Sequence, residues 1–108
     1  MTVEIPGPVA AYLAADKAKD PDLVAHCFTD DARVFDENHD YRGLDAIRNW
    51  KRETAAKYQY VVEPLAVAVQ DETVALRARL TGNFPGSPAE LNYRFTLAND
   101  KIASLEIQ

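Results

Sequence analysis

The chain has 108 residues, enough for one domain (1–108), and its 47% hydrophobic and 27% charged composition is that of a folded protein rather than a disordered one. Its 17 acidic and 12 basic side chains give a net charge of -5, which disfavours nucleic-acid binding, and no apolar run approaches the roughly 20 residues that span a membrane. The sequence shows no metal-ligand cluster, glycine-rich phosphate loop or signal-peptide pattern, so we expect no metal, no cofactor and a cytoplasmic location.

Two short helices are predicted at the start of the chain. Pro6 and Pro8 open the first, and its apolar positions recur at helical spacing: Val9, Tyr12 and Leu13. The second begins at an Asp-Pro pair, in which Asp20 can accept hydrogen bonds from free backbone N–H groups and proline has none to lose at the first helical position. We expect this helix to run from residue 21 to about residue 28.

A third helix is predicted from near Gly43. One face of it carries the less polar side chains: Leu44, Ile47, Trp50 and Thr54. Lys51, Arg52 and Lys57 lie toward its C-terminal end, where positive charge suits the helix dipole.

Residues 32–36 alternate between apolar and polar and predict a strand. Val34 and Asp36 share one face, and Phe35 lies on the other. If Val34 points into the core, Asp36 points there too, and a carboxylate in that place has either partners or a raised pKa. The inverted arrangement, with Phe35 packed inward and Asp36 exposed, stays open. The polar run that follows, 37–42, is predicted to be a loop.

Strands dominate the remainder of the chain. Alternating or apolar runs predict four of them: 58–69, 73–83, 91–97 and 102–107. Pro64 cannot donate to a strand ladder, so it marks an edge, a bulge or a bend. Helices followed by an antiparallel meander indicate an α+β fold, with helices covering one face of a curved sheet.

The 61–69 strand is apolar on both faces, although a sheet with helices on one side should be polar on the other. A symmetric dimer through the sheet would cover the second face. The alternative is a twisted strand that crosses from the core to the rim. Arg77 and Arg79 alternate with Val74 and Leu76, which places them on the dimer or solvent face more readily than around a ligand carboxylate.

With this layout, the sequence resembles the nuclear transport factor 2-like superfamily, in the branch near ketosteroid isomerases and SnoaL-like cyclases. Tyr12 with Asp20 eight positions on, the segment 28–36 and the segment 43–47 carry the resemblance, and the final alternating strands complete it. The resemblance implies a cone-shaped α+β barrel: three N-terminal helices packed on a curved, mostly antiparallel sheet around a deep cavity. It also implies a homodimer.

The resemblance further implies a chemistry. In ketosteroid isomerases a strand carboxylate removes a proton beside a carbonyl, while a tyrosine and a protonated carboxylic acid bind the oxyanion. Asp36 matches the base and Tyr12 matches the tyrosine, although Tyr12 could equally be an ordinary core tyrosine. The acid's position falls at Leu91 or Asn92, and neither is a carboxylic acid. The amide of Asn92 could donate instead, but its alternation with Leu91 argues that it faces away from the cavity.

Four further residues are candidates for contact with an apolar, oxygen-bearing small molecule: Phe35, Trp50, Leu91 and Tyr93. His39 is either a solvated loop residue or a second proton-transfer group beside Asp36, as in a dehydratase of this superfamily. Three functions therefore stay open. They are a cofactor-independent isomerase or cyclase, a ligand-binding or assembly module without chemistry, and a dehydratase or hydrolase that uses Asp36 and His39. Asp40 and Arg42 are further candidates for the hydrolase.

Overall fold

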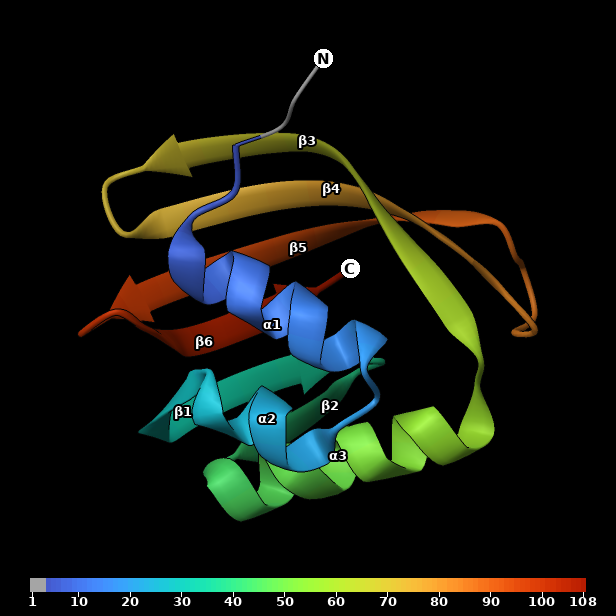
Figure 1. The fold of residues 1–108 in the computed structure, drawn as a ribbon, viewed down its shortest axis with the longest axis horizontal. Helices are drawn as coiled ribbons and strands as arrows, with labels where there is room; N and C mark the ends of the chain where they lie inside the picture. The colour runs from blue at the N-terminus through green and yellow to red at the C-terminus, as the bar shows by residue number, and fades with distance from the viewer. Residues whose placement is uncertain (1–3) are drawn as a thin grey trace.

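Residues 4–108, which the computed structural model describes, form three helices on one face of a curved six-stranded sheet (Figure 1). The helices are α1 (Gly7–Lys17), α2 (Pro21–His26) and α3 (Leu44–Lys57). The strands are β1 (Phe28–Asp36), β2 (His39–Arg42), β3 (Tyr60–Gln70), β4 (Thr73–Gly82), β5 (Ala89–Ala98) and β6 (Lys101–Ile107). This confirms the predicted α+β fold. None of the helices in the described part of the chain is long and apolar enough to cross a membrane.

The strands lie in the order β2-β1-β6-β5-β4-β3. Neighbouring strands are antiparallel except β1 and β6, which run parallel, with Val34 opposite Leu105. The core fills the space between the helices and the inner face of this sheet. Its largest fully buried side chains come from both layers: Tyr12, Phe28, Ile47, Leu76, Phe95, Ile102 and Leu105.

Pro64 lies at a bulge in an edge strand. β3 is the last strand in the sheet order, and its register against β4 shifts between Pro64 and Ala66. An edge and a bulge are the two places where a strand can lose a donor without leaving a neighbour unpaired. The structure therefore confirms the predicted irregularity.

Two predictions about residues 26–42 are wrong. The second helix ends at His26, and Phe28 already begins β1. The segment after Asp36 forms a hairpin with strand β2 instead of a loop, because Glu37 and Asn38 both adopt positive φ, of 51° and 63°. Two consecutive positive φ angles make the tight turn whose twist matches that of the flanking strands. The usual Asn-Gly signal for such a turn is missing here, so the turn could not be predicted from the sequence.

Replacing Asp20 with alanine should lower the free energy of unfolding by about 1 kcal/mol, the usual value of an N-cap. Asp20 Oδ1 accepts from the backbone N–H groups of Asp22 (3.1 Å) and Leu23 (3.2 Å) at the start of α2. Urea denaturation of the wild type, Asp20→Ala and Asp20→Asn measures the effect. Asparagine keeps an acceptor oxygen and should retain most of the stability. Equal losses in both variants would show that the cap does not act through its hydrogen bonds.

Candidate functional site

A cavity of about 280 Å³ lies between α3 and the sheet, near the end of β1. Among the described residues that line it, the charged groups are two acids, Asp36 and Glu37, and one cation, Lys51. Thr54 adds a hydroxyl, and the rest of the wall is aromatic or apolar: Trp50, Tyr58, Tyr60, Leu80, Phe84, Pro85, Leu91, Tyr93 and Ile107. The volume lies near the lower end of the roughly 300–1,000 Å³ usual for ligand sites, so it suits a small, largely apolar molecule.

Asp36 lies on the wall of this cavity, as its alternation with Val34 predicts. Val34 is fully buried, whereas Asp36 is half-buried at the end of β1. The indole Nε1–H of Trp50 donates to Asp36 Oδ2 at 3.0 Å and fixes the carboxylate. Burial raises the pKa of Asp36 above its ordinary value, and the Trp50 hydrogen bond and the Lys51 charge only partly oppose this. A carboxylate with these properties can act as a base on a bound ligand.

Tyr12 is buried on α1 and is not part of the cavity wall. Its ring packs edge-on against Phe28 and Phe95, with centroid distances of 5.9 and 5.7 Å, so it has the packing role of a core tyrosine. Burial, with the nearby Asp16 carboxylate, raises the pKa of Tyr12 well above that of a free tyrosine. The phenol therefore keeps its proton, and its role as a donor to a ligand stays a prediction.

The structure brings only some of the other predicted site residues together. Trp50, Leu91 and Tyr93 line the cavity, as expected. Phe35 does not, because strand alternation turns it to the face opposite Asp36. His39 lies opposite Asp36 in the β1–β2 ladder, yet it is exposed outside the cavity wall, and its Nδ1 lies 2.8 Å from the Glu37 carbonyl oxygen.

Asp40 and Arg42, the further candidates for a hydrolase, also lie outside the cavity. Arg33 and Arg42 donate to the two carboxylate oxygens of Asp40, at 2.7 and 3.0 Å. These hydrogen bonds lower the pKa of Asp40 below its ordinary value. Asp40 is therefore a surface ion-pair partner, and the convergence of two carboxylates and an arginine in the cavity is absent among the residues that the structure describes.

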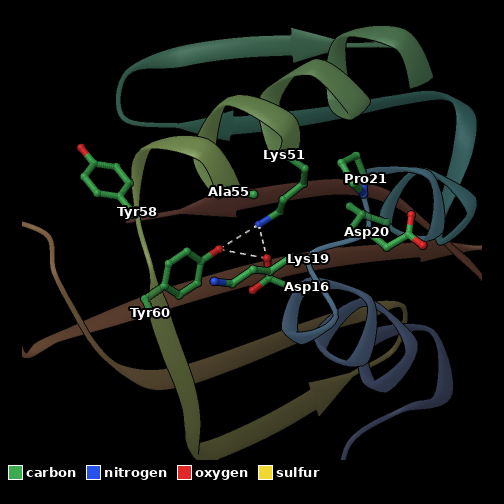
Figure 2. A pocket seen from close by; sticks show the side chains of 9 residues that line it. Asp16, Lys19, Asp20, Pro21, Lys51, Ala55, Tyr58 and Tyr60 are labelled. Carbon is green, nitrogen blue, oxygen red and sulfur yellow. Dashed lines mark hydrogen bonds and ion pairs between the residues drawn. The ribbon is translucent and has the colours of Figure 1, made fainter.

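Asp16, Lys51 and Tyr60, none of which was predicted as a site residue, form a largely buried cluster at the cavity wall (Figure 2). Lys51 Nζ lies 2.7 Å from Asp16 Oδ1, the Tyr60 hydroxyl donates to the same oxygen at 2.9 Å, and Lys51 Nζ lies 3.4 Å from the Tyr60 oxygen. The side chains of Lys51 and Asp16 are only 7% and 9% exposed. Lys51 was expected toward the C-terminal end of its helix, where it would interact with the helix dipole. This interpretation is wrong, because Lys51 lies in the middle of α3 and is buried, and Lys57 is the basic residue of the last turn.

The spacing of this cluster held a signal that could have found it. Lys51 follows Ile47 by four residues on α3, and Asp16 follows Tyr12 by four on α1. Residues four apart share one helix face, and both Ile47 and Tyr12 are buried. The cluster also lines a smaller pocket of about 10 Å³, which shares Lys51, Tyr58 and Tyr60 with the cavity beside Asp36 (Figure 2). Its size is close to that of one water molecule.

The comparison with protein families agrees with this geometry. The family model described as SnoaL-like domain matches residues 9–105. The chain belongs to the SnoaL-like family. A solved structure described as a "putative polyketide cyclase" from Sinorhizobium meliloti is similar to this SnoaL-like protein, with 39% identity, a TM-score of 0.93, and coverage of 96% of this chain and 95% of that one.

Two more distant structures share the fold of this SnoaL-like protein. A protein with a ketosteroid isomerase-like fold from Catenulispora acidiphila, solved in complex with trimethylamine, is 20% identical, with a TM-score of 0.86 over 97% of this chain and 86% of that one. The epoxide hydrolase/cyclase-like enzyme SalBIII, linked to pyran ring formation in the polyether salinomycin, is 20% identical, with a TM-score of 0.76 over 93% and 85% of the two chains. No match was found among the curated proteins.

The resemblance places a second oxyanion-binding acid at Leu91 or Asn92, and neither residue brings a carboxylic acid to the cavity of this SnoaL-like domain. Leu91 lies on the cavity wall, and Asn92 is exposed on the opposite face of β5, as the alternation predicts. Tyr93, two residues after Leu91, shares its face and lines the cavity. Burial raises the pKa of Tyr93 well above its ordinary value, so its hydroxyl is a protonated hydrogen-bond donor.

Proposed function

We propose that this SnoaL-like protein catalyses a cofactor-independent reaction in which Asp36 removes a proton beside the carbonyl of an apolar, oxygen-bearing small molecule. The observation that carries the proposal is the half-buried Asp36 carboxylate on the wall of a largely aromatic cavity, with a pKa raised by burial. The similarity to a protein described as a polyketide cyclase favours ring closure over isomerisation.

The proposed step needs no group beyond the protein and its substrate. The C–H proton moves to the Asp36 carboxylate, and the electron pair of the broken bond moves onto the carbonyl oxygen. In a cyclisation the resulting enolate carbon attacks a second carbonyl, whose oxygen then takes the proton. In an isomerisation Asp36 returns the proton to another carbon. Trp50 holds the carboxylate in place through the 3.0 Å hydrogen bond to Oδ2.

The phenols of Tyr93 and Tyr12 are the proposed donors to the carbonyl oxygen. Tyr93 lines the cavity, and Tyr12 lies behind the wall, where its raised pKa is influenced by both Asp36 and Tyr93. A single missing oxyanion donor typically costs about 2.7–4 kcal/mol of barrier. The absence of a carboxylic acid at Leu91 and Asn92 therefore makes this site a poor match to efficient steroid isomerisation.

The proposal is tested by proton exchange into D₂O with 2-tetralone, an apolar bicyclic ketone whose most acidic protons lie between the carbonyl and the aromatic ring. NMR should show that the wild type accelerates loss of these proton signals beyond the buffer rate. The ketone could bind, seen as shifts of the cavity resonances, without faster exchange. This result would overturn the role of Asp36 as a base and leave a non-catalytic ligand-binding module of the same fold.

The dehydratase alternative rests on His39, which lies opposite Asp36 in the ladder. We expect His39→Gln to change the exchange rate less than about threefold, because the ring is exposed and stacks on Tyr41 outside the cavity wall. The same NMR assay measures it. A loss of about a hundredfold, the scale of a lost proton-transfer group, would instead make His39 a partner of Asp36.

We also propose that the protein forms a homodimer through the outer face of the sheet. That face carries small side chains at Ala66, Ala68 and Ala75 beside a groove, and Val61 on the same edge strand is 68% exposed. Arg77 and Arg79 lie on this face as predicted, and both reach Glu90. Sedimentation should show a dimer that Ala75→Glu dissociates, whereas Ala10→Glu on exposed α1 should not. A wild-type monomer at micromolar concentration would contradict the proposal.

A further inference from the structure

We propose that Lys51, held by Asp16 and Tyr60, binds the substrate's carbonyl oxygen while negative charge forms on it. The inference rests on the proposed function and adds the group that takes the place of the missing second acid. It also names a substrate class: carbonyl compounds whose conjugate base carries its charge on a planar, conjugated oxygen, as in an aryl ketone enolate or a phenolate.

The position of Lys51 carries the first part of the inference. Lys51 lines the cavity together with Asp36 and is the one cation among the described lining residues. A lysine ammonium has three N–H donors. Lys51 Nζ lies 2.7 Å from Asp16 Oδ1 and a longer 3.4 Å from the Tyr60 oxygen, so these two acceptors leave one N–H for an oxygen in the cavity.

The charges around Lys51 carry the second part. Proton transfer turns Asp36 neutral and places one negative charge on the substrate oxygen, so the net charge of the cavity does not change. Lys51 and Asp36 interact electrostatically before the step, because each influences the pKa of the other. An ammonium that stabilises the Asp36 carboxylate can stabilise the enolate oxygen afterwards.

The buried partners explain how Lys51 stays available. Burial lowers the pKa of Lys51, and the charge and hydrogen bond of Asp16 oppose that change and favour the ammonium. The Tyr60 hydroxyl donates to the same Asp16 oxygen and helps to hold this carboxylate against Lys51. The aromatic side chains of Trp50, Tyr58, Tyr60 and Tyr93 then suit a flat, conjugated ligand next to the ammonium.

The test uses 4-nitrophenol, whose absorbance distinguishes its ionised and neutral forms, in the Asp36→Asn background. That variant imitates the site after Asp36 has taken its proton. We expect it to bind the phenolate more tightly than the phenol, and we expect an added Lys51→Met change to weaken the phenolate by roughly ten- to a hundredfold, as for a charge-assisted hydrogen bond. Lys57→Met, an exposed charge on the same helix, is the matched control and should change little.

Equal phenolate affinity with and without Lys51, or no binding of either form, would overturn the inference. If Lys51→Met does not fold, the neutral pair Asp16→Asn/Lys51→Met replaces it. The ¹⁵N chemical shift of the Lys51 ammonium in the Asp36→Asn protein tests the contact without any substitution at Lys51. A chemical shift that saturating 4-nitrophenolate does not change would also overturn the inference. The wild type could fail to accelerate 2-tetralone exchange while phenolate binding still depends on Lys51. This result would reject the role of Asp36 as a base and keep the proposed anion site at Lys51.

Discussion

Asparagine in place of Asp36 is expected to lower the rate of 2-tetralone exchange by about 10²–10⁴-fold, the contribution typical of a positioned general base. Asparagine has nearly the same shape, and its amide oxygen can still accept from Trp50 Nε1, which lies 3.0 Å from Oδ2 in the native protein. The variant therefore removes the proton acceptor with little effect on packing. Glu37→Gln is the matched control, because Glu37 also lines the cavity. Similar losses in both variants would show a general effect of cavity charge.

The pH dependence of the wild-type exchange rate provides a second test of Asp36. The exchange rate should rise as Asp36 loses its proton, with a midpoint above that of a free aspartate, because burial raises its pKa. The contribution of Asp36 to the free energy of unfolding should change in the opposite direction. The unfolded chain releases this proton at lower pH than the folded one, so the free energy of unfolding falls as pH rises through the folded-state pKa. Asp36→Asn should remove the contribution of this group to both pH dependences.

The largest effect on stability is expected at Lys51. Lys51→Met should lower the free energy of unfolding by about 3–5 kcal/mol, because it leaves the Asp16 carboxylate buried without its cation. The hydroxyl of Tyr60 still donates to Asp16 and recovers only part of the loss. Urea denaturation of wild type and variant at neutral pH measures the difference.

The double variant Asp16→Asn/Lys51→Met separates the effect of an unpaired Asp16 charge from the effect of lost side-chain packing at Lys51. It buries no unpaired charge, so we expect it to be more stable than Lys51→Met alone. Lys57→Met, on the exposed last turn of α3, should stay within about 0.5 kcal/mol of the wild type. A double variant as unstable as Lys51→Met would mean that the lysine stem, and not the charge, holds α3 against α1.

Much of the fold could be predicted because local patterns and tertiary packing agree. The Asp-Pro pair at residues 20 and 21 marks the start of α2, and its carboxylate caps that helix as expected. The alternation of Val34 with Asp36 placed the carboxylate on the inner face, because a strand that buries one residue must turn the next but one the same way. β2 was missed, since the positive φ angles at Glu37 and Asn38 replace the usual glycine signal.

The candidate site was only half predictable for a different reason. Asp36, Trp50, Leu91 and Tyr93 follow from strand and helix periodicity together with the family resemblance, and all four line the cavity. Lys51 does not follow, because lysine is rarely buried and its burial requires a partner on another element. Asp16 is that partner, and it lies on α1, far away in sequence. Helix spacing places each of the two residues on a buried face, but their pairing is known only once the two helices are placed in the fold.

The parallel pairing of β1 with β6 has a consequence for folding during synthesis. Asp36 stands on a strand whose inner neighbour in the sheet is β6, near the C-terminal end of the chain, while β2 offers it only a short exposed edge. During synthesis, the ribosome must therefore add the residues of β6 before the sheet around Asp36 can be completed. Nascent chains stalled before Lys101 should therefore lack the assembled cavity that Asp36 lines.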